Sequence, residues 1–262
     1  MGIKPGSDLT SLEKYFLYYP CSGNDIISPV KTFLDVVSTF WFVDKFYFRG
    51  DNNSIQLIRP IIIHGMKYLR SEFTGSDFVN MDSKNINDDD TYDYLEPGYR
   101  TDIYEYKSRI IKIHIRRGFG YNSLFGPTTL PINCNNLGIF FYRGDSFEGG
   151  SNQTWMSTQP VRMLRGQEEV SLLQKIIESL PDKGILATDG SNHDFPGCRS
   201  NSPPDDDYKE LVKYNWNRDI SCTEAVKKVN DFTDRKGNLF NCIGHAGMSY
   251  GPTLIWQIRK SK

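Results

Sequence analysis

Residues 15–44 read YFLYYPCSGNDIISPVKTFLDVVSTFWFVD, and this stretch decides the expected fold. Its opening aromatic run stops at Pro20, as a buried strand does before a turn. Residues 25–29 then supply helix-start signals, and the apolar residues from Val30 to Val37 recur at helical spacing. A second run of β-branched and aromatic residues is closed by Asp44. The stretch therefore predicts a strand, a helix and a second strand in succession.

Further buried-strand and helix patterns extend this unit along the chain. Strands are expected at 109–116, 137–142, 184–188, 239–243 and 253–259, and helices at 168–180 and 221–231. The last two strands are close enough to form an antiparallel hairpin. Residues 45–108 lack a clear pattern. We therefore expect one domain, 1–262, with an insertion at about 45–108 and an α/β fold: a three-layer Rossmann-like sheet, mostly parallel, with a C-terminal antiparallel hairpin.

The composition excludes several classes of function. Among 262 residues, 31 Lys and Arg face 32 Asp and Glu, so no global field attracts polyanions and a nucleic-acid partner is not expected. The five cysteines include no C-x-x-C pair, which favours reduced thiols. Residues 1–10 lack signal-peptide features, and no run approaches the roughly 18 apolar residues of a membrane helix. The sequence thus predicts a cytoplasmic protein without a membrane partner.

Polar residues follow the ends of four expected strands, and this placement predicts a binding site. In open α/β sheets, ligands bind beyond the carboxyl ends of the strands. The rim of the expected crevice comprises Pro20, Cys21, Ser22, Gly23, Asn24 and Asp25; Asp44; Arg143 to Asn152; and Asp189 to Asn192. Loops presented by a rigid sheet are common carriers of function.

Asp44 and Gly23 carry the interpretation of the ligand. A carboxylate at the tip of the second strand is the usual acceptor for the two hydroxyls of a ribose. The small turn Ser22-Gly23-Asn24 lets the backbone come close to a ligand, but the full G-x-G-x-x-G of diphosphate sites is missing. We therefore expect a nucleoside with a small amino-acid tail rather than a dinucleotide.

This order of elements resembles that of the class I S-adenosylmethionine-dependent methyltransferases over residues 15–44 and 109–259, and several segments look like those of uncharacterised bacterial proteins with this fold. The resemblance implies S-adenosylmethionine as cofactor. The implied cofactor-binding residues are Pro20, Ser22, Gly23, Asn24, Asp25, Asp44, Arg143, Gly144 and Ser146, and the implied catalytic residues, near the transferred methyl, are Asp145 and Glu148. His114 is a further candidate for taking the proton of the acceptor. The glycine-rich first motif and the Asn-Pro-Pro-Tyr motif are missing, so methylation of base amino groups is unsupported.

Other interpretations remain open. Asp145, Asp189 and Asn192 would offer three hard oxygen ligands to Mg²⁺ along the same rim, but these carboxylates equally suit local turns, so we assign no metal. Cys21 beside a helix start is either a nucleophile or, as we prefer, a packed side chain. The protein is either an enzyme acting on a small molecule or a protein, a non-catalytic or regulatory nucleoside-binding module, or another nucleotide-using α/β enzyme.

Overall fold

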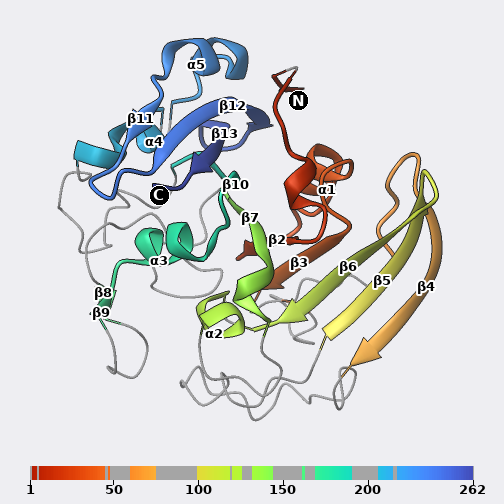
Figure 1. Ribbon diagram of the computed structural model, residues 1–262. Coiled ribbons are helices and arrows are strands. Elements are labelled where there is room, and N and C mark those ends of the chain that lie inside the picture. Colours follow the sequence, from red (N-terminus) through yellow and green to blue (C-terminus); the bar gives the residue numbers. More distant parts are fainter. Residues whose placement is uncertain are drawn as a thin grey trace.

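A computed structural model describes residues 2–4, 6–44, 47, 60–74, 99–118, 120–125, 132–143, 161–162, 169–190, 206–214 and 217–261. Within these residues, an eleven-stranded mixed sheet dominates the molecule (Figure 1). Its strands are β1 (Gly2–Ile3), β2 (Phe16–Pro20), β3 (Thr39–Asp44), β4 (Lys67–Thr74), β5 (Tyr99–Tyr106), β6 (Arg109–Arg117), β7 (Leu137–Tyr142), β10 (Gly184–Thr188), β11 (Phe232–Thr233), β12 (Leu239–Met248) and β13 (Pro252–Arg259). The short strands β8 (Val161–Arg162) and β9 (Glu169–Val170) pair separately.

The centre of the sheet is parallel and its two sides are antiparallel. The strand order is β1-β12-β13-β10-β7-β2-β3-β6-β5-β4, with β11 added to β12. Neighbours are parallel from β10 through β7, β2 and β3 to β6. β12 also runs in this direction, because it and β10 are both antiparallel to β13. On the other side, β6, β5 and β4 form an antiparallel meander, which we call the wing and which extends away from the rest of the sheet in Figure 1.

The helices of the described residues are short. They are α1 (Ile27–Phe33), α2 (Gly120–Phe125), α3 (Leu172–Ser179), α4 (Lys209–Val212) and α5 (Cys222–Lys228), with single 3-10 turns at Thr10–Leu12, Cys134–Asn136 and Asp206–Tyr208. Serine hydroxyls cap two of them: Ser171 accepts from the Gln174 N–H, and Ser221 accepts from the Glu224 N–H. Among these helices, none has the length and apolar character that crossing a bilayer requires.

Hydrophobic side chains cover both faces of the sheet. Neighbouring residues of a strand point to opposite faces, so Tyr18 joins one cluster and Tyr19 the other. The Tyr19 cluster includes Phe33 of α1, and the Tyr18 cluster includes Ile176 of α3 together with Trp256 of β13. The central strands are therefore buried on both sides, which explains why they read as continuous apolar runs rather than alternating ones.

The predicted fold class is wrong, although some of its parts are confirmed. The strand–helix–strand unit and the C-terminal antiparallel hairpin are present as β2, α1, β3 and as β12, β13. However, the sheet contains six antiparallel and four parallel strand pairs, and its helices have at most eight residues, so it is not a mostly parallel, three-layer Rossmann-like sheet. The main reason is the wing, because β4 and β5 lie in the stretch that we expected to be an insertion and instead continue the sheet.

Candidate functional site

The predicted meeting of strand ends at one edge is confirmed for the described residues. β3, β2, β7 and β10 are successive parallel neighbours, so Asp44, the turn after Pro20, Arg143 and Asp189 all lie where these strands end. We call this the carboxyl edge. The chain moves from β2 to β3 on one side and later to β7 on the other, so the strand order reverses at β2. Such reversal points are where open sheets bind ligands.

The turn after β2 is held in a strained, compact conformation. Cys21 has φ of 54° and Gly23 has φ of 53°, both in the left-handed region. Glycine adopts this conformation freely, whereas for Cys21 it costs about 1–2 kcal/mol. The Asp25 N–H donates to the Ser22 carbonyl at 2.9 Å, which closes the turn. Strain of this kind persists only where surrounding contacts impose it, and it is common at binding sites.

Asp44 is the buried acid of this edge. Asp44 is only 2% exposed, and its side-chain Oδ2 accepts a hydrogen bond from the Gly23 N–H at 2.9 Å. The Asp44 carbonyl accepts from Tyr47 and Gly118, each at 3.3 Å. The acid therefore ties the turn after β2 to the ends of β3 and β6. A carboxylate has about four acceptor positions, so a side chain of this kind can accept several hydrogen bonds at once.

Tyr47 supports the same turn, and the sequence reasoning missed it. Its hydroxyl donates to the Gly23 carbonyl at 2.6 Å and lies 2.7 Å from the Ser22 Oγ. Burial raises the pKa of Tyr47 well above its usual value, and the nearby Asp44 charge adds to this. The phenol therefore stays protonated and keeps donating. The one sequence signal was its place three residues after Asp44, which allows the bond from the Tyr47 N–H to the Asp44 carbonyl.

Asp25 and Arg143, both predicted to bind cofactor, bind each other. Arg143 donates from Nε to Asp25 Oδ2 at 2.6 Å and from Nη2 to Oδ1 at 2.8 Å, a bidentate pair. Its Nη1 donates to the Ala246 carbonyl of β12 at 3.1 Å. Burial disfavours the charged guanidinium, but the bonds and charge of Asp25 outweigh it and raise the pKa of Arg143. The pair braces three chain segments rather than leaving two free ligand-binding charges.

Asp189 and Gly190 complete the edge beyond β10. Asp189 is buried, and the Gly190 N–H donates to the Thr188 Oγ1 at 3.0 Å. Gly190 has φ of +72°, and a Cβ there would lie 2.9 Å from the Cα of Val212. The turn therefore requires glycine and packs directly against the end of α4. Within the parts of the chain that the structure describes, no group of three potential metal ligands occurs.

The remaining predicted site residues have different locations. Pro20 ends β2 opposite Val43, and Asn24 is an exposed turn residue. Gly144, Asp145, Ser146, Glu148 and Asn192 lie outside the described residues. These include both predicted catalytic acids and two of the three residues that were considered, but not assigned, as magnesium ligands.

His114 lies inside β6 rather than at the carboxyl edge. It stacks on Trp41 with ring centres 4.0 Å apart, and its Nδ1 is 2.7 Å from the Thr101 Oγ1. Burial, and secondarily the charge of Lys112, lowers the pKa of His114 to about 3. His114 pairs with Trp41 three residues before the strand end, a distance of about 10 Å along the strand. It is therefore a packed neutral histidine, remote from the acid of the edge.

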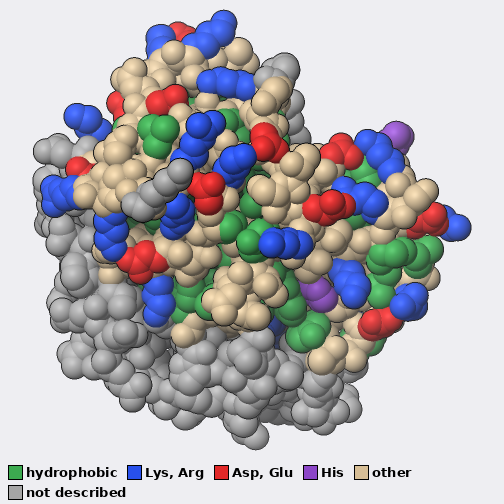
Figure 2. Space-filling view, in the orientation of Figure 1, with side chains coloured by type: hydrophobic (Ala, Val, Ile, Leu, Met, Phe, Trp, Pro, Cys, Tyr) green, Lys and Arg blue, Asp and Glu red, His purple; other side chains and the backbone are tan. Residues whose placement is uncertain are grey.

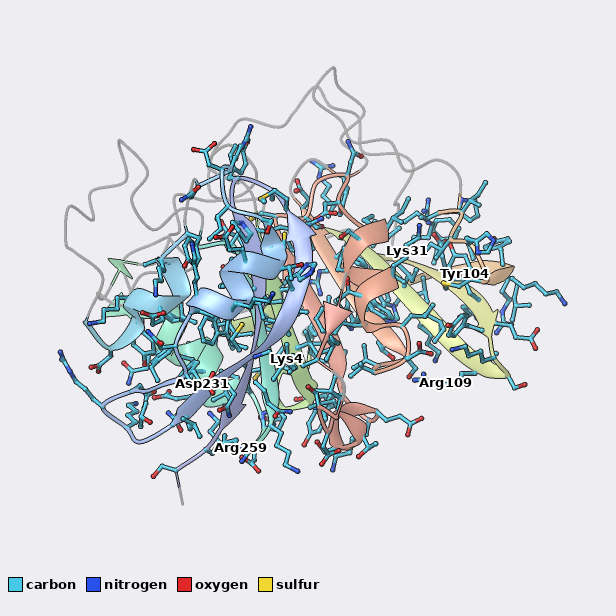
Figure 3. The ribbon with its side chains drawn as sticks, turned by 90° about the horizontal axis from the view of Figure 1, so that it is seen from above. Lys4, Lys31, Tyr104, Arg109, Asp231 and Arg259 are labelled. Atoms are coloured by element: carbon cyan, nitrogen blue, oxygen red, sulfur yellow. The ribbon has the colours of Figure 1, made fainter. Side chains whose placement is uncertain are left out.

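Two further contacts hold β12, the strand whose Ala246 carbonyl accepts a hydrogen bond from Arg143. The Lys4 Nζ donates to the Cys242 carbonyl at 2.6 Å, and the Cys242 N–H donates to Asp231 Oδ1 at 2.9 Å. Figure 3 shows Lys4 and Asp231 beside β12, well separated from Tyr104 and Arg109 on the wing. These contacts thus hold β12 in a part of the molecule away from the wing.

Comparisons of the chain with protein-family models, with curated proteins and with solved structures found no match.

Proposed function

We propose that the protein binds S-adenosylmethionine at the carboxyl edge and transfers its methyl group to a small-molecule or protein acceptor. The observation that carries the proposal is the buried Asp44 carboxylate, bonded to the Gly23 N–H beside the point where the strand order reverses. A fixed carboxylate next to a close-approaching backbone turn suits the paired hydroxyls of a ribose and the adjoining part of a nucleoside.

Each described residue has a distinct role in this proposal. Asp44 accepts the ribose hydroxyls, while the turn from Cys21 to Asn24 presents backbone groups to the cofactor. Tyr47 and the Asp25–Arg143 pair act as positioning residues, because their polar atoms hold the turn and the strand ends together. Asp145 and Glu148 are proposed to face the acceptor, on the resemblance alone.

The chemistry is a displacement at the methyl carbon. When bound, S-adenosylmethionine supplies a sulfonium, and its methyl passes to a nucleophilic acceptor atom while the demethylated cofactor leaves as a neutral thioether. The acceptor loses a proton where it began protonated. The protein's part is to hold acceptor and methyl in line, which removes much of the entropic barrier.

Calorimetric titration of the full chain with S-adenosylmethionine and with its demethylated product tests the proposal. We expect saturable binding of both, and no binding at millimolar ligand would overturn the proposal. Asp44→Ala should weaken binding by about 1–3 kcal/mol, roughly 5- to 150-fold, through loss of a charged hydrogen-bond acceptor. Asp44→Asn keeps an acceptor for the Gly23 N–H and isolates the effect of the charge.

The matched control is Asp35→Ala, which removes an exposed carboxylate paired with Lys107 rather than one at the carboxyl edge. The affinity of Asp35→Ala for S-adenosylmethionine should equal that of the unmodified chain. If Asp44→Ala also binds with unchanged affinity, the ribose assignment is wrong. Binding without transfer to any acceptor would instead favour the second candidate, a non-catalytic nucleoside-binding module, which the internal pairing of Asp25 with Arg143 also suits.

A further inference from the structure

The two outer edges of the sheet differ in length. One edge consists of β1 and β11, which have two residues each and both pair with β12, and the other is β4, which has eight. In the described part of the chain, β4 pairs with β5 on one side only, and Figure 1 shows it as the outermost strand of the wing. A long open edge presents backbone N–H and C=O groups that can pair with a further strand.

β4 also exposes apolar side chains. Tyr68 is 43% exposed, Leu69 37% and Phe73 59%. Figure 2 shows hydrophobic side chains over the wing, interspersed with Lys, Arg, Asp and Glu. An edge strand that leaves such residues in water gains from covering them, because burial of apolar surface is favourable.

Two opposite charges of β4, Arg70 and Glu72, lie symmetrically about Ser71. Arg70 and Glu72 flank it, and both side chains are more than half exposed. If two copies of β4 pair antiparallel about Ser71, opposing residue numbers add up to 142. Arg70 of each copy then faces Glu72 of the other, within the part of β4, Arg70 to Thr74, that pairs regularly with β5; a register shift lies between Tyr68 and Arg70. Opposite charges facing each other across strands are stabilising.

This is the register that the charges select. A two-fold axis perpendicular to the sheet leaves every side chain on its own face of the sheet. Because residues directly opposite each other share a face, the axis must pass between two copies of the same residue. Centring the axis on Arg70 places Arg70 opposite Arg70, and centring it on Glu72 places Glu72 opposite Glu72. Like charges directly opposite each other are destabilising. Of these three central positions, only Ser71, whose small side chain bonds Asp102 of β5 at 2.6 Å, sets opposite charges across the strand pair.

We propose that the protein forms a symmetric homodimer in which the β4 strands of two copies pair antiparallel about Ser71, joining the two sheets into one. A single strand pair is a small interface, so the dimer is weak and depends on protein concentration. The proposal is independent of the function proposed for the carboxyl edge.

Sedimentation equilibrium of the full chain, over a concentration series, tests the dimer. The unmodified chain should rise from its monomer mass of 30.1 kDa towards twice that value. R70E places a glutamate opposite Glu72, and E72R places an arginine opposite Arg70, so each variant alone should dimerise at least about ten-fold more weakly. An equimolar mixture of R70E and E72R restores both opposite-charge pairs between the copies and should dimerise again.

The mixture is the most specific test. Neither chain regains its own intrachain Arg70–Glu72 pair, so recovery must come from contacts between the two chains. K31E, which alters an exposed lysine of α1, is the control and should dimerise normally. Circular dichroism of each dilute variant checks folding, and the double exchange R70E/E72R should also dimerise. The proposal is overturned if the unmodified chain stays monomeric, if both single variants dimerise as strongly as the unmodified chain, or if the mixture does not recover dimerisation.

Discussion

The carboxyl edge of the parallel strands and the outer edge of β4 use charge in opposite ways. At the carboxyl edge, Arg143 is nearly buried and its guanidinium bonds Asp25 twice, so each charge depends on its partner. At β4, Arg70 and Glu72 also form an ion pair, but both stay in contact with water. Breaking a buried pair leaves an uncompensated charge, whereas breaking an exposed one leaves a hydrated charge. An Arg–carboxylate pair therefore has a structural role at the carboxyl edge, whereas the exposed pair of β4 is the one that we propose to contact a second copy.

The largest expected effect comes from breaking the buried pair. Arg143→Met should lower the free energy of unfolding by about 2–4 kcal/mol, since it leaves Asp25 partly buried without its partner and frees the Ala246 carbonyl. Urea denaturation measures the loss. The double variant Asp25→Asn with Arg143→Met should recover part of it, and a loss no larger than that of Arg70→Met would contradict the comparison.

Gly190→Ala tests the crowded turn of the carboxyl edge. The substitution should destabilise the protein by about 2 kcal/mol, because the left-handed backbone strains alanine and the new Cβ meets the Val212 Cα. Gly6→Ala is the matched control, with φ of +86° and no atom within 4 Å of the added Cβ. Thermal unfolding should show a smaller loss for Gly6→Ala, and equal losses would mean that crowding contributes nothing.

The wing should be sensitive to acid through His114. Its folded-state pKa of about 3 lies below the usual value of 6.5, so the unfolded chain binds the proton more readily. As far as His114 determines it, the free energy of unfolding is therefore highest above pH 6.5 and decreases as the pH falls towards 3. Between pH 7.5 and 5 the decline should be about 1–2 kcal/mol. His114→Gln should flatten this part of the profile in urea titrations, and an unchanged slope would assign the decline to other groups.

The smallest effect is expected at the exposed pair of β4. In dilute, monomeric protein, Arg70→Met should change the free energy of unfolding by less than about 0.5 kcal/mol, because exposed ion pairs contribute little. Urea denaturation of this variant beside Arg143→Met completes the comparison. A loss above 1 kcal/mol would show that Arg70 is a structural residue of the wing.

Much of the central region could be predicted from the sequence. The expected strands at 109–116, 137–142 and 184–188 match β6, β7 and β10 closely, and the first two strands match β2 and β3. Continuous aromatic and β-branched runs mark strands buried on both faces, so the pattern was strong where burial was deepest. The convergence of Gly23, Asp44 and Asp189 followed from the parallel order of these strands.

The wing and the internal bonds of the edge could not be predicted. β4 reads KYLRSEFT and is largely exposed, so no apolar periodicity identified it as a strand. Its pairing with β5 crosses more than twenty residues of chain, and local sequence says little about such a partner. Likewise, nothing in the local sequence linked Asp25 to Arg143, 118 residues away.

By itself, the sequence determined which segments are buried strands, which of them end in polar residues, and where the turn after β2 needs small residues. These are local properties, set by side-chain volume, hydrophobicity and backbone freedom. Only the tertiary structure decided that antiparallel strand pairs outnumber parallel ones, that Arg143 is committed to Asp25, and that Tyr47 holds the turn. Those outcomes depend on which distant groups meet in space, because a buried charge or hydroxyl must find a partner wherever the fold provides one.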